Sequence, residues 1–401
     1  MISKENINYS LRNIRASKSR SLLTVFSILI GIATLFIFVS FGLGLYQYID
    51  EITSSSSANK ILVQSKGGTV PGLSSSFPLT DNDIKALKKT PGVSIATGLY
   101  IKSAEIKQDS TKKYVFITSY DPDYPIIIEL SNVEIIKGRD LRRGDSKKVV
   151  LGYNYLIEDK IFPKSYDVGN KINIQGIDLS IVGFFEEIGN PQDDSNIYIT
   201  NDYYEELFPD TTSYGMLLAE GDAKDMDNIV EKAEQNLRRA RGLKEGKEDF
   251  VVQSYQELLD SYLGAMNIVI GFIILIALIS VLVSSVNTAN TMITSVLERY
   301  KEIGVLKAIG ARNSEIFKIF LFESSLLGFV AGAVGVFCGW VFTSIAKIIL
   351  VQLGWSFLSP SYPIYLFVGC ILFATITGAV SGVFPAINAS KTNTVDALRY
   401  E

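Results

Sequence analysis

The chain has 401 residues, of which 47% are hydrophobic and 20% are charged, and its formal net charge is −4. This composition is too apolar for a soluble protein unless the apolar residues are clustered. The chain contains no His and two Cys, and both Cys338 and Cys370 lie in apolar runs. Ser-His and Cys-His catalysis are therefore excluded, and the sequence offers no ligand set for a zinc, haem or iron-sulfur site and no disulfide framework.

The apolar residues are concentrated in four runs that contain no charged residue. These runs are residues 21–49, 261–297, 324–346 and 348–390. About 20 apolar residues suffice to cross a membrane as a helix, and Pro360 and Pro363 mark a loop at residues 352–363 in the last run. We predict spanning helices at residues 22–45, 265–286, 316–346 and 364–385. A cleaved signal peptide is the alternative for the first, although its apolar core is typically about 7 to 15 residues.

The Lys and Arg residues indicate the orientation, because cytoplasmic flanks hold the excess of these residues. Residues 1–20 and 298–318 are rich in them, whereas the connection between the third and fourth spans has only Lys347. Both termini and residues 298–314 are therefore predicted to be cytoplasmic. The outer segment, residues 46–264, has 25 basic and 35 acidic residues, a net of −10, which argues against nucleic acid as a partner.

The outer segment alternates strand and helix signals, which predicts a large α+β domain between the first and second spans. The expected strands are residues 60–64, 111–120, 131–136, 149–151, 171–175, 179–185 and 196–200. A helix capped by Thr80 is expected up to residue 91, and another at residues 226–241, where Ile229, Ala233 and Leu237 share a face. This order predicts a β-rich lobe inserted between two halves of an α/β lobe.

The charged segment after the second span predicts a short helix that ends at Gly310. Ile303 and Leu306 are three residues apart and would form its apolar face, with Lys301 and Lys307 at the sides. Such a helix could bind in a groove of another protein. The alternative is an ordinary charged connector that stops at a glycine.

Two further features lie in the spans. Small residues recur at a spacing of four, which allows close contact between membrane helices, either within the chain or at a dimer seam. These glycines are Gly328, Gly332, Gly335, Gly339, Gly378 and Gly382. Glu323 is an intramembrane acid near the inner interface, for which we favour an ion pair or snorkelling over a proton relay.

The segment from residue 299 has the pattern R-x-x-E-I-G-x-L-x-A-x-G-A, which resembles the ABC transporter permeases that export macrolides and peptides or release lipoproteins. The residues of this predicted ATPase-coupling loop are Arg299, Lys301, Glu302, Ile303, Gly304, Leu306, Lys307, Ala308, Gly310, Ala311 and Arg312. The outer segment has a Gly138-Arg139 turn, the strand ending at Gly152 and the strand ending at Gly183, in an order similar to the MacB-like periplasmic core domain. Residues 10–31 and the closing residues 381–401 also resemble the family, with Asn393-Thr394 in place of its frequent Asp-Pro.

The resemblance implies a cytoplasmic amphipathic entry helix at residues 1–20 and a first span at residues 21–49. A MacB-like core domain at residues 50–260 and an FtsX-like permease domain at residues 261–401 would follow. It also implies a cell-membrane protein that works as a dimer with a second permease copy or homologue, in contact with membrane lipid and with a separate ABC ATPase. An extracytoplasmic adaptor is a further possible partner.

The chain has no G-x-x-x-x-G-K-[ST] phosphate loop, so ATP and Mg would be bound by the partner subunit, and we expect no enzyme activity or cofactor in this chain. The expected function is to transmit ATP-driven movement to the outer domain for export or extraction of a macrolide, peptide, lipid or lipoprotein. The first alternative is an FtsX-like regulator of cell-wall hydrolases, or another signalling partner, that transports nothing. A secondary transporter is the second, although four spans show no inverted repeat.

Overall fold

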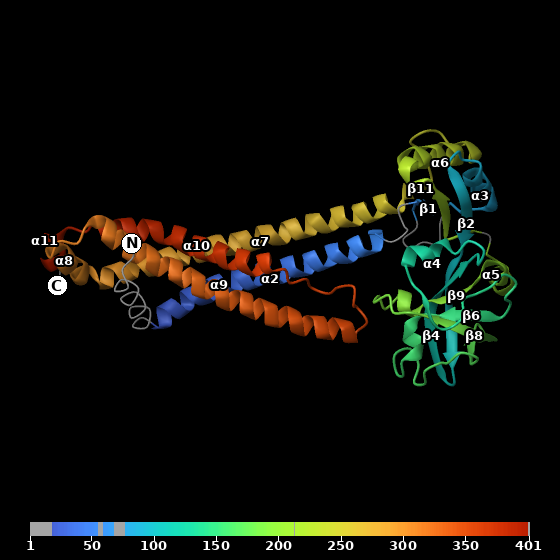
Figure 1. Ribbon diagram of the computed structural model, residues 1–401, viewed down its shortest axis with the longest axis horizontal. Coiled ribbons are helices and arrows are strands. Elements are labelled where there is room, and N and C mark those ends of the chain that lie inside the picture. The colour runs from blue at the N-terminus through green and yellow to red at the C-terminus, as the bar shows by residue number, and fades with distance from the viewer. Residues whose placement is uncertain (1–17, 55–58, 68–76, 212, 400–401) are drawn as a thin grey trace. The chain divides into compact units, whose positions relative to one another are not determined.

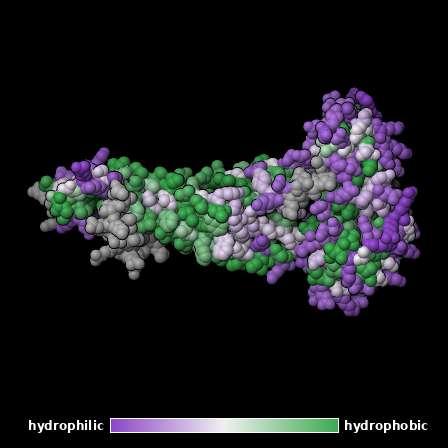
Figure 2. All heavy atoms as spheres, viewed as in Figure 1, coloured by the Kyte–Doolittle hydropathy of each residue, from purple (hydrophilic) through white to green (hydrophobic). Residues whose placement is uncertain are grey.

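The computed structural model describes residues 18–54, 59–67, 77–211 and 213–399 (Figure 1). The described chain forms two compact units. A helical unit contains residues up to 45, residues 265–349 and residues from 359, and an outer unit contains residues 46–264 and 350–358. Apolar side chains cover the helices and polar ones cover much of the outer unit (Figure 2). Residues 1–17 of the predicted entry helix lie outside the described residues.

Four helices are long and apolar enough to cross a membrane, which confirms the four predicted spans. They are α2 (Lys18–Ser54), α7 (Tyr255–Glu298), α9 (Asn313–Gln352) and α10 (Ile364–Ser390). Two short helices, α8 (Tyr300–Ala308) and α11 (Thr394–Arg399), complete the helical unit. One apolar core joins α2, α9 and α10 around Ile32, Phe36 and Ala374, and a second joins α7, α8, α9 and α10.

The smaller lobe of the outer unit is an antiparallel sheet covered by two helices. Its strands are β1 (Lys60–Ser65), β2 (Val93–Leu99), β10 (Met216–Gly221) and β11 (Phe250–Ser254), in the order β11-β1-β10-β2. The helices are α3 (Asp81–Lys88), which begins with a capping box between Thr80 and Asp83, and α6 (Met226–Ala240). Ile229, Ala233 and Leu237 of α6 are buried in this core, as predicted.

The larger lobe contains the other seven strands in the order β5-β8-β6-β9-β4-β3-β7. They are β3 (Ile101–Gln108), β4 (Thr111–Tyr120), β5 (Ile135–Gly138), β6 (Lys148–Leu151), β7 (Lys171–Ile174), β8 (Ile177–Phe185) and β9 (Ile197–Thr200). Because β7 also pairs with β8, six of the strands close on themselves around an apolar core, and β5 extends β8. Two helices, α4 (Ile126–Ser131) and α5 (Asn201–Leu207), and the 3-10 helices Tyr153–Leu156 and Asp193–Ser195 complete the lobe.

The larger lobe is inserted between β2 and β10 of the smaller lobe, which confirms the predicted insertion. The predicted strand at residues 131–136 is wrong in its first half. There, α4 ends at Ser131, Asn132 takes a left-handed conformation with φ 49°, and β5 starts only at Ile135. A further 3-10 helix, Ala223–Asp225, precedes α6.

Candidate coupling site

The predicted coupling loop is a helix-turn between two spans. Arg299 follows the last residue of α7 and precedes α8, and Gly310 then takes a φ of +102° before α9 begins at Asn313. Only glycine adopts such a φ without steric cost, which explains Gly310 at the turn. The Arg312 N–H donates to Glu315 Oε2 at 2.9 Å and so caps the first turn of α9.

An ion pair fixes the start of α8 to α9. Arg299 Nη1 lies 3.1 Å from Glu323 Oε2, and the side chains are 13% and 5% exposed. Removing Arg299 would leave the Glu323 charge in a site with little water, so Glu323 depends strongly on its partner. The structure thus shows an ion pair at Glu323, which is one of the two roles that the sequence favoured over a proton relay.

The C-terminal segment holds the other end of α8. Lys307 Nζ donates to the Thr392 carbonyl oxygen at 2.6 Å, just before α11. Asn393 Oδ1 accepts from the Val395 N–H at 3.1 Å and caps α11. Asn393 therefore forms the turn at the position where the family frequently has Asp-Pro.

The predicted apolar docking face of α8 is wrong. Ile303 is 2% exposed because it packs against its own chain, in a core with Met292, Ile316 and Phe320. The opposite face is the exposed one, and Val305 and Ile309, four residues apart, are 50% and 77% exposed there. Helical spacing could have found this pair, because residues 305 and 309 lie on one side of a helix.

The remaining loop residues divide by exposure. Lys301, Glu302, Ala308, Gly310 and Arg312 are exposed, Arg299, Leu306, Lys307 and Ala311 are half-buried, and Gly304 is buried with Ile303. Charged and apolar side chains therefore share one accessible face, which suits binding to another protein more than to a small molecule.

The six predicted packing glycines all lie at helix contacts within the chain. A Cβ on Gly328, Gly332, Gly378 or Gly382 would approach atoms of the facing helix, α9 or α10, to 2.0–2.7 Å. A Cβ on Gly335 or Gly339 of α9 would come within about 3.0 Å of α2. These residues allow α9 to approach both neighbours closely.

The glycines of the outer motifs bring strands together in the larger lobe. Gly138 has a φ of +83°, and its Cβ would lie 2.2 Å from the Val182 carbonyl oxygen. In turn, a Cβ on Gly183 would lie 2.3 Å from the Arg139 carbonyl oxygen. These two glycines are therefore needed for β5 to pair closely with β8.

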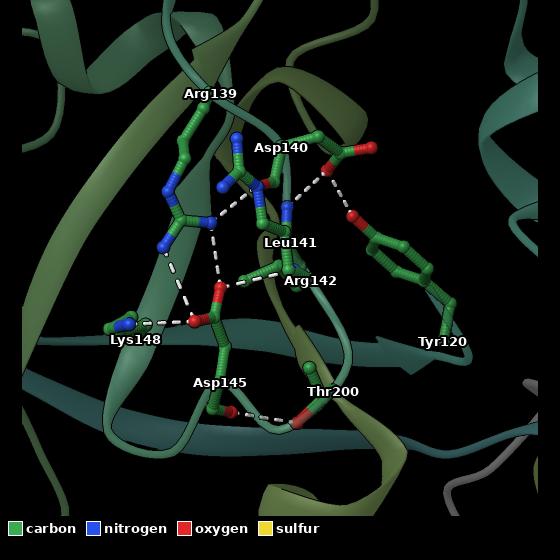
Figure 3. A network of polar contacts seen from close by, with 8 residues as sticks. All are labelled: Tyr120, Arg139, Asp140, Leu141, Arg142, Asp145, Lys148 and Thr200. Carbon is green, nitrogen blue, oxygen red and sulfur yellow. Dashed lines mark hydrogen bonds and ion pairs between the residues drawn. The ribbon is translucent and has the colours of Figure 1, made fainter. Parts of the chain in front are cut away.

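A polar network follows Gly138 (Figure 3). Arg139 binds both carboxylate oxygens of Asp145 at 2.7 and 3.2 Å, and Lys148 Nζ lies 2.7 Å from Asp145 Oδ1. The Tyr120 hydroxyl donates to Asp140. Burial alone would raise the pKa of Asp145, but the hydrogen bonds from Arg139, Lys148 and the Arg142 N–H outweigh it and hold this pKa well below its usual range. This motif therefore stabilises the lobe.

No group of three or more His, Cys, Asp or Glu residues that could hold a metal ion occurs in the described part of the chain.

Family models match nearly the whole length of this molecule. The MacB-like periplasmic core domain matches residues 21–236, and the FtsX-like permease C-terminal domain matches residues 274–394. The chain belongs to the ABC transporter permeases with these two domains, and it is a multi-pass membrane protein.

Three known proteins are similar to parts or all of this chain. An uncharacterized ABC transporter permease of Methanocaldococcus jannaschii is 31% identical over 98% of both chains. The macrolide export ATP-binding/permease protein MacB of Neisseria gonorrhoeae is 28% identical over 98% of this chain and 60% of its own length. The periplasmic region of MacB from Actinobacillus actinomycetemcomitans is 14% identical, with a TM-score of 0.42, over 53% of this chain and 97% of that structure.

Proposed function

We propose that this permease couples a separate ABC ATPase to its outer domain, with α8 as the contact to the ATPase. The observation that carries the proposal is the exposed face of α8, since Lys301, Glu302, Val305 and Ile309 project from a helix whose two ends are fixed. Because both ends of α8 are fixed, a displacement or rotation of α8 by the ATPase would move α7 and α9 with it.

The path from α8 to the outer domain supports the same proposal. Helix α7 is unbroken from Tyr255 to Glu298 and begins directly after strand β11. Its first turn is closed by a capping box, in which the Ser254 N–H donates to Glu257 Oε2 at 2.9 Å and the Glu257 N–H donates to Ser254 Oγ at 3.0 Å. Movement of α8 therefore has a continuous helical route to a strand of the smaller lobe.

The orientation belongs to this proposal. The excess of Lys and Arg in residues 1–20 and 298–318 supports a cytoplasmic location for both termini and α8, with the α+β domain outside the cell membrane. The functional unit would contain a second permease copy or homologue and two ATPase subunits, which bind ATP and Mg. Membrane lipid would cover the exposed apolar faces of the spans. The outer domain would then act on a macrolide, peptide, lipid or lipoprotein, with or without an adaptor.

The test is affinity purification of the tagged full-length chain from its membrane in mild detergent, followed by identification of the bound chains and an ATPase assay. We expect a Walker-motif ATPase to co-purify, and Glu302→Ala or Ile309→Asp to reduce its recovery or uncouple its activity. Lys66→Ala, on the outer domain, is the control for a surface change. A wild-type complex without any ATPase would contradict the proposal and favour a regulator or receptor role.

A further inference from the structure

The loop between α9 and α10 binds the larger lobe of the outer unit at one small surface. The Phe357 N–H donates to the Gly189 carbonyl oxygen at 3.4 Å, and Ser356 Oγ donates to Glu187 Oε1 at 3.2 Å. Lys160 Nζ donates to the Gln352 carbonyl oxygen at 3.1 Å. The end of α9 with the loop that follows it, residues 350–358, thus faces residues 187–191. These two segments are here called the helix loop and the lobe loop.

Gly189 is the centre of this contact. Its φ is +84°, and a Cβ would lie 2.8 Å from Ser356 Cβ and 3.2 Å from the Phe357 nitrogen. Any side chain at this position would therefore be strained and would push the helix loop away. The close approach of the two loops requires glycine here.

The other side of Gly189 is bound by a buried carboxylate. Asp194 is 1% exposed, and its Oδ2 accepts from the Gly189 N–H at 3.0 Å. Its Oδ1 accepts from the Ile188 N–H at 2.7 Å. One residue, Gly189, therefore binds Asp194 through its N–H and the helix loop through its carbonyl oxygen.

No cation forms an ion pair with Asp194 within the described residues, and its charged neighbours are acidic. Burial, as the largest cause, and the nearby charges of Glu187 and Asp193 raise the pKa of Asp194 to about 6, against the two backbone hydrogen bonds. Tyr198 also faces this group, and burial raises its own pKa to well above neutrality, so it stays uncharged. Lys160 is the basic residue at the contact, and it binds the helix loop.

We propose that the lobe loop is a proton-controlled latch, in which protonation of Asp194 strengthens the hold of residues 187–191 on the loop between α9 and α10. Opening the lobe loop would admit water to Asp194, and the charged carboxylate gains most from that water. The neutral acid gains less, so protonation favours the closed loop. The use of such a latch in transmitting motion between α9 and the outer domain rests on the proposed function, whereas the latch itself does not.

The pH range follows from the two states of the loop. An open, hydrated Asp194 would have a pKa near the ordinary 3.8, and the closed one has a pKa of about 6. The state with the higher pKa is favoured as the pH falls, so the closed loop gains stability from about pH 6 downward. Between pH 7 and pH 5 the opening equilibrium should fall by about tenfold, since one pKa unit corresponds to a factor of ten.

Amide hydrogen exchange of the full-length protein in detergent micelles tests the latch directly. After correction for intrinsic exchange, peptides covering residues 187–191 should be protected about tenfold more at pH 5 than at pH 7. Asp194→Asn, which cannot ionise, should remove this dependence. Asp193→Asn should keep it with a lower midpoint, because the Asp193 charge helps to raise the pKa of Asp194. Protection that does not change with pH, or that changes equally in Asp194→Asn, would overturn the proposal.

Two additional measurements separate an effect on the latch from misfolding of the variants and from loss of transport. Exchange in peptides of β8 reports whether Asp194→Asn still folds. The ring of Trp355 lies beside that of Phe357, with centroids 5.6 Å apart and planes tilted by 38°. Trp340→Phe makes Trp355 the single tryptophan of the chain. Its emission should titrate with a midpoint near pH 6, and Gly189→Ala should abolish that transition by displacing the helix loop. A transition unchanged in Gly189→Ala would contradict the latch, whatever the ATPase result.

Discussion

Replacing Arg299 by Met should destabilise the helical unit strongly, because it leaves Glu323 without its cation. Glu323 is 5% exposed and lies in the middle of a helix contact, so its charge cannot reach water. Loss of one partner of a buried ion pair typically costs about 3–5 kcal/mol. Glu323→Leu should cost less, because the long Arg299 side chain starts from a loop and can turn its head to water.

The double variant Arg299→Met with Glu323→Leu shows whether the loss of stability comes from breaking the ion pair. Two apolar side chains of similar volume should restore most of the lost stability, since replacing a buried pair by well-packed apolar residues is often neutral. The measurement is unfolding of the four proteins in mixed micelles, followed by the helical circular dichroism signal, with the coupling free energy taken from the cycle. If the single and double variants are equally unstable, Arg299 and Glu323 do not act as a pair.

Three further predictions, tested with five substitutions, concern separate parts of the structure. Gly382→Ala should destabilise the α9–α10 contact, because its Cβ would lie 2.0 Å from a facing serine oxygen, whereas Gly369→Ala in the same helix, with nothing within 4 Å, should be neutral or slightly stabilising in the same unfolding assay. Asp145→Asn should lower the melting temperature at neutral pH. The pKa of Asp145 is lower in the folded protein than the value of 3.8 in the unfolded chain, so the Asp145 carboxylate stabilises the fold above about pH 3.8. This stability is lost as the pH falls further, and the difference in melting temperature between wild type and Asp145→Asn should therefore shrink in acid. Ile309→Asp should leave the melting temperature unchanged but reduce ATPase recovery, while Ile303→Ala should cost about 2–5 kcal/mol in unfolding free energy.

The spans and the helix α6 could be predicted from the sequence because their signals are local. A long uncharged run is stable in lipid as a spanning helix. The spacing of Ile229, Ala233 and Leu237 specifies one buried face of α6. The cap of α3 at Thr80 was equally local, since Asp83 is only three residues away. Patterns within one or two turns of helix were therefore sufficient for these elements.

Strand β3 was missed for the opposite reason. Its eight residues include the charged Lys102, Glu105 and Lys107, and so many charges in so short a segment give a weak strand signal until a partner strand and a core are known. Its eight residues pair with β4 in full register, and only that pairing makes the strand stable. The burial of Ala104 and Ile106 follows from the closed sheet, which no local pattern specifies.

The buried face of α8 was predicted wrongly because both faces of this helix carry apolar residues. Ile303 and Val305 are similar side chains two positions apart, and the sequence of α8 alone does not say which faces the spans. The choice depends on the core of Met292 in α7 and of Ile316 and Phe320 in α9, against which Ile303 packs. Local spacing therefore pairs Val305 with Ile309, but only these tertiary contacts show that this pair is the accessible one.

Helix α7 differs from the other spans in how little of it the chain buries. In its most apolar 18-residue window 11% is buried, against 22–39% for the other three helices. A helix with few side-chain contacts loses little packing when it shifts. Helix α9 contacts α2 and α10 closely through its glycines, so a shift of α9 would open cavities at these contacts. The span that leads from β11 to the loop before α8 is therefore also the one that can move at the lowest cost in packing. This combination makes α7 the first helix to label in a test of the proposed coupling to an ATPase.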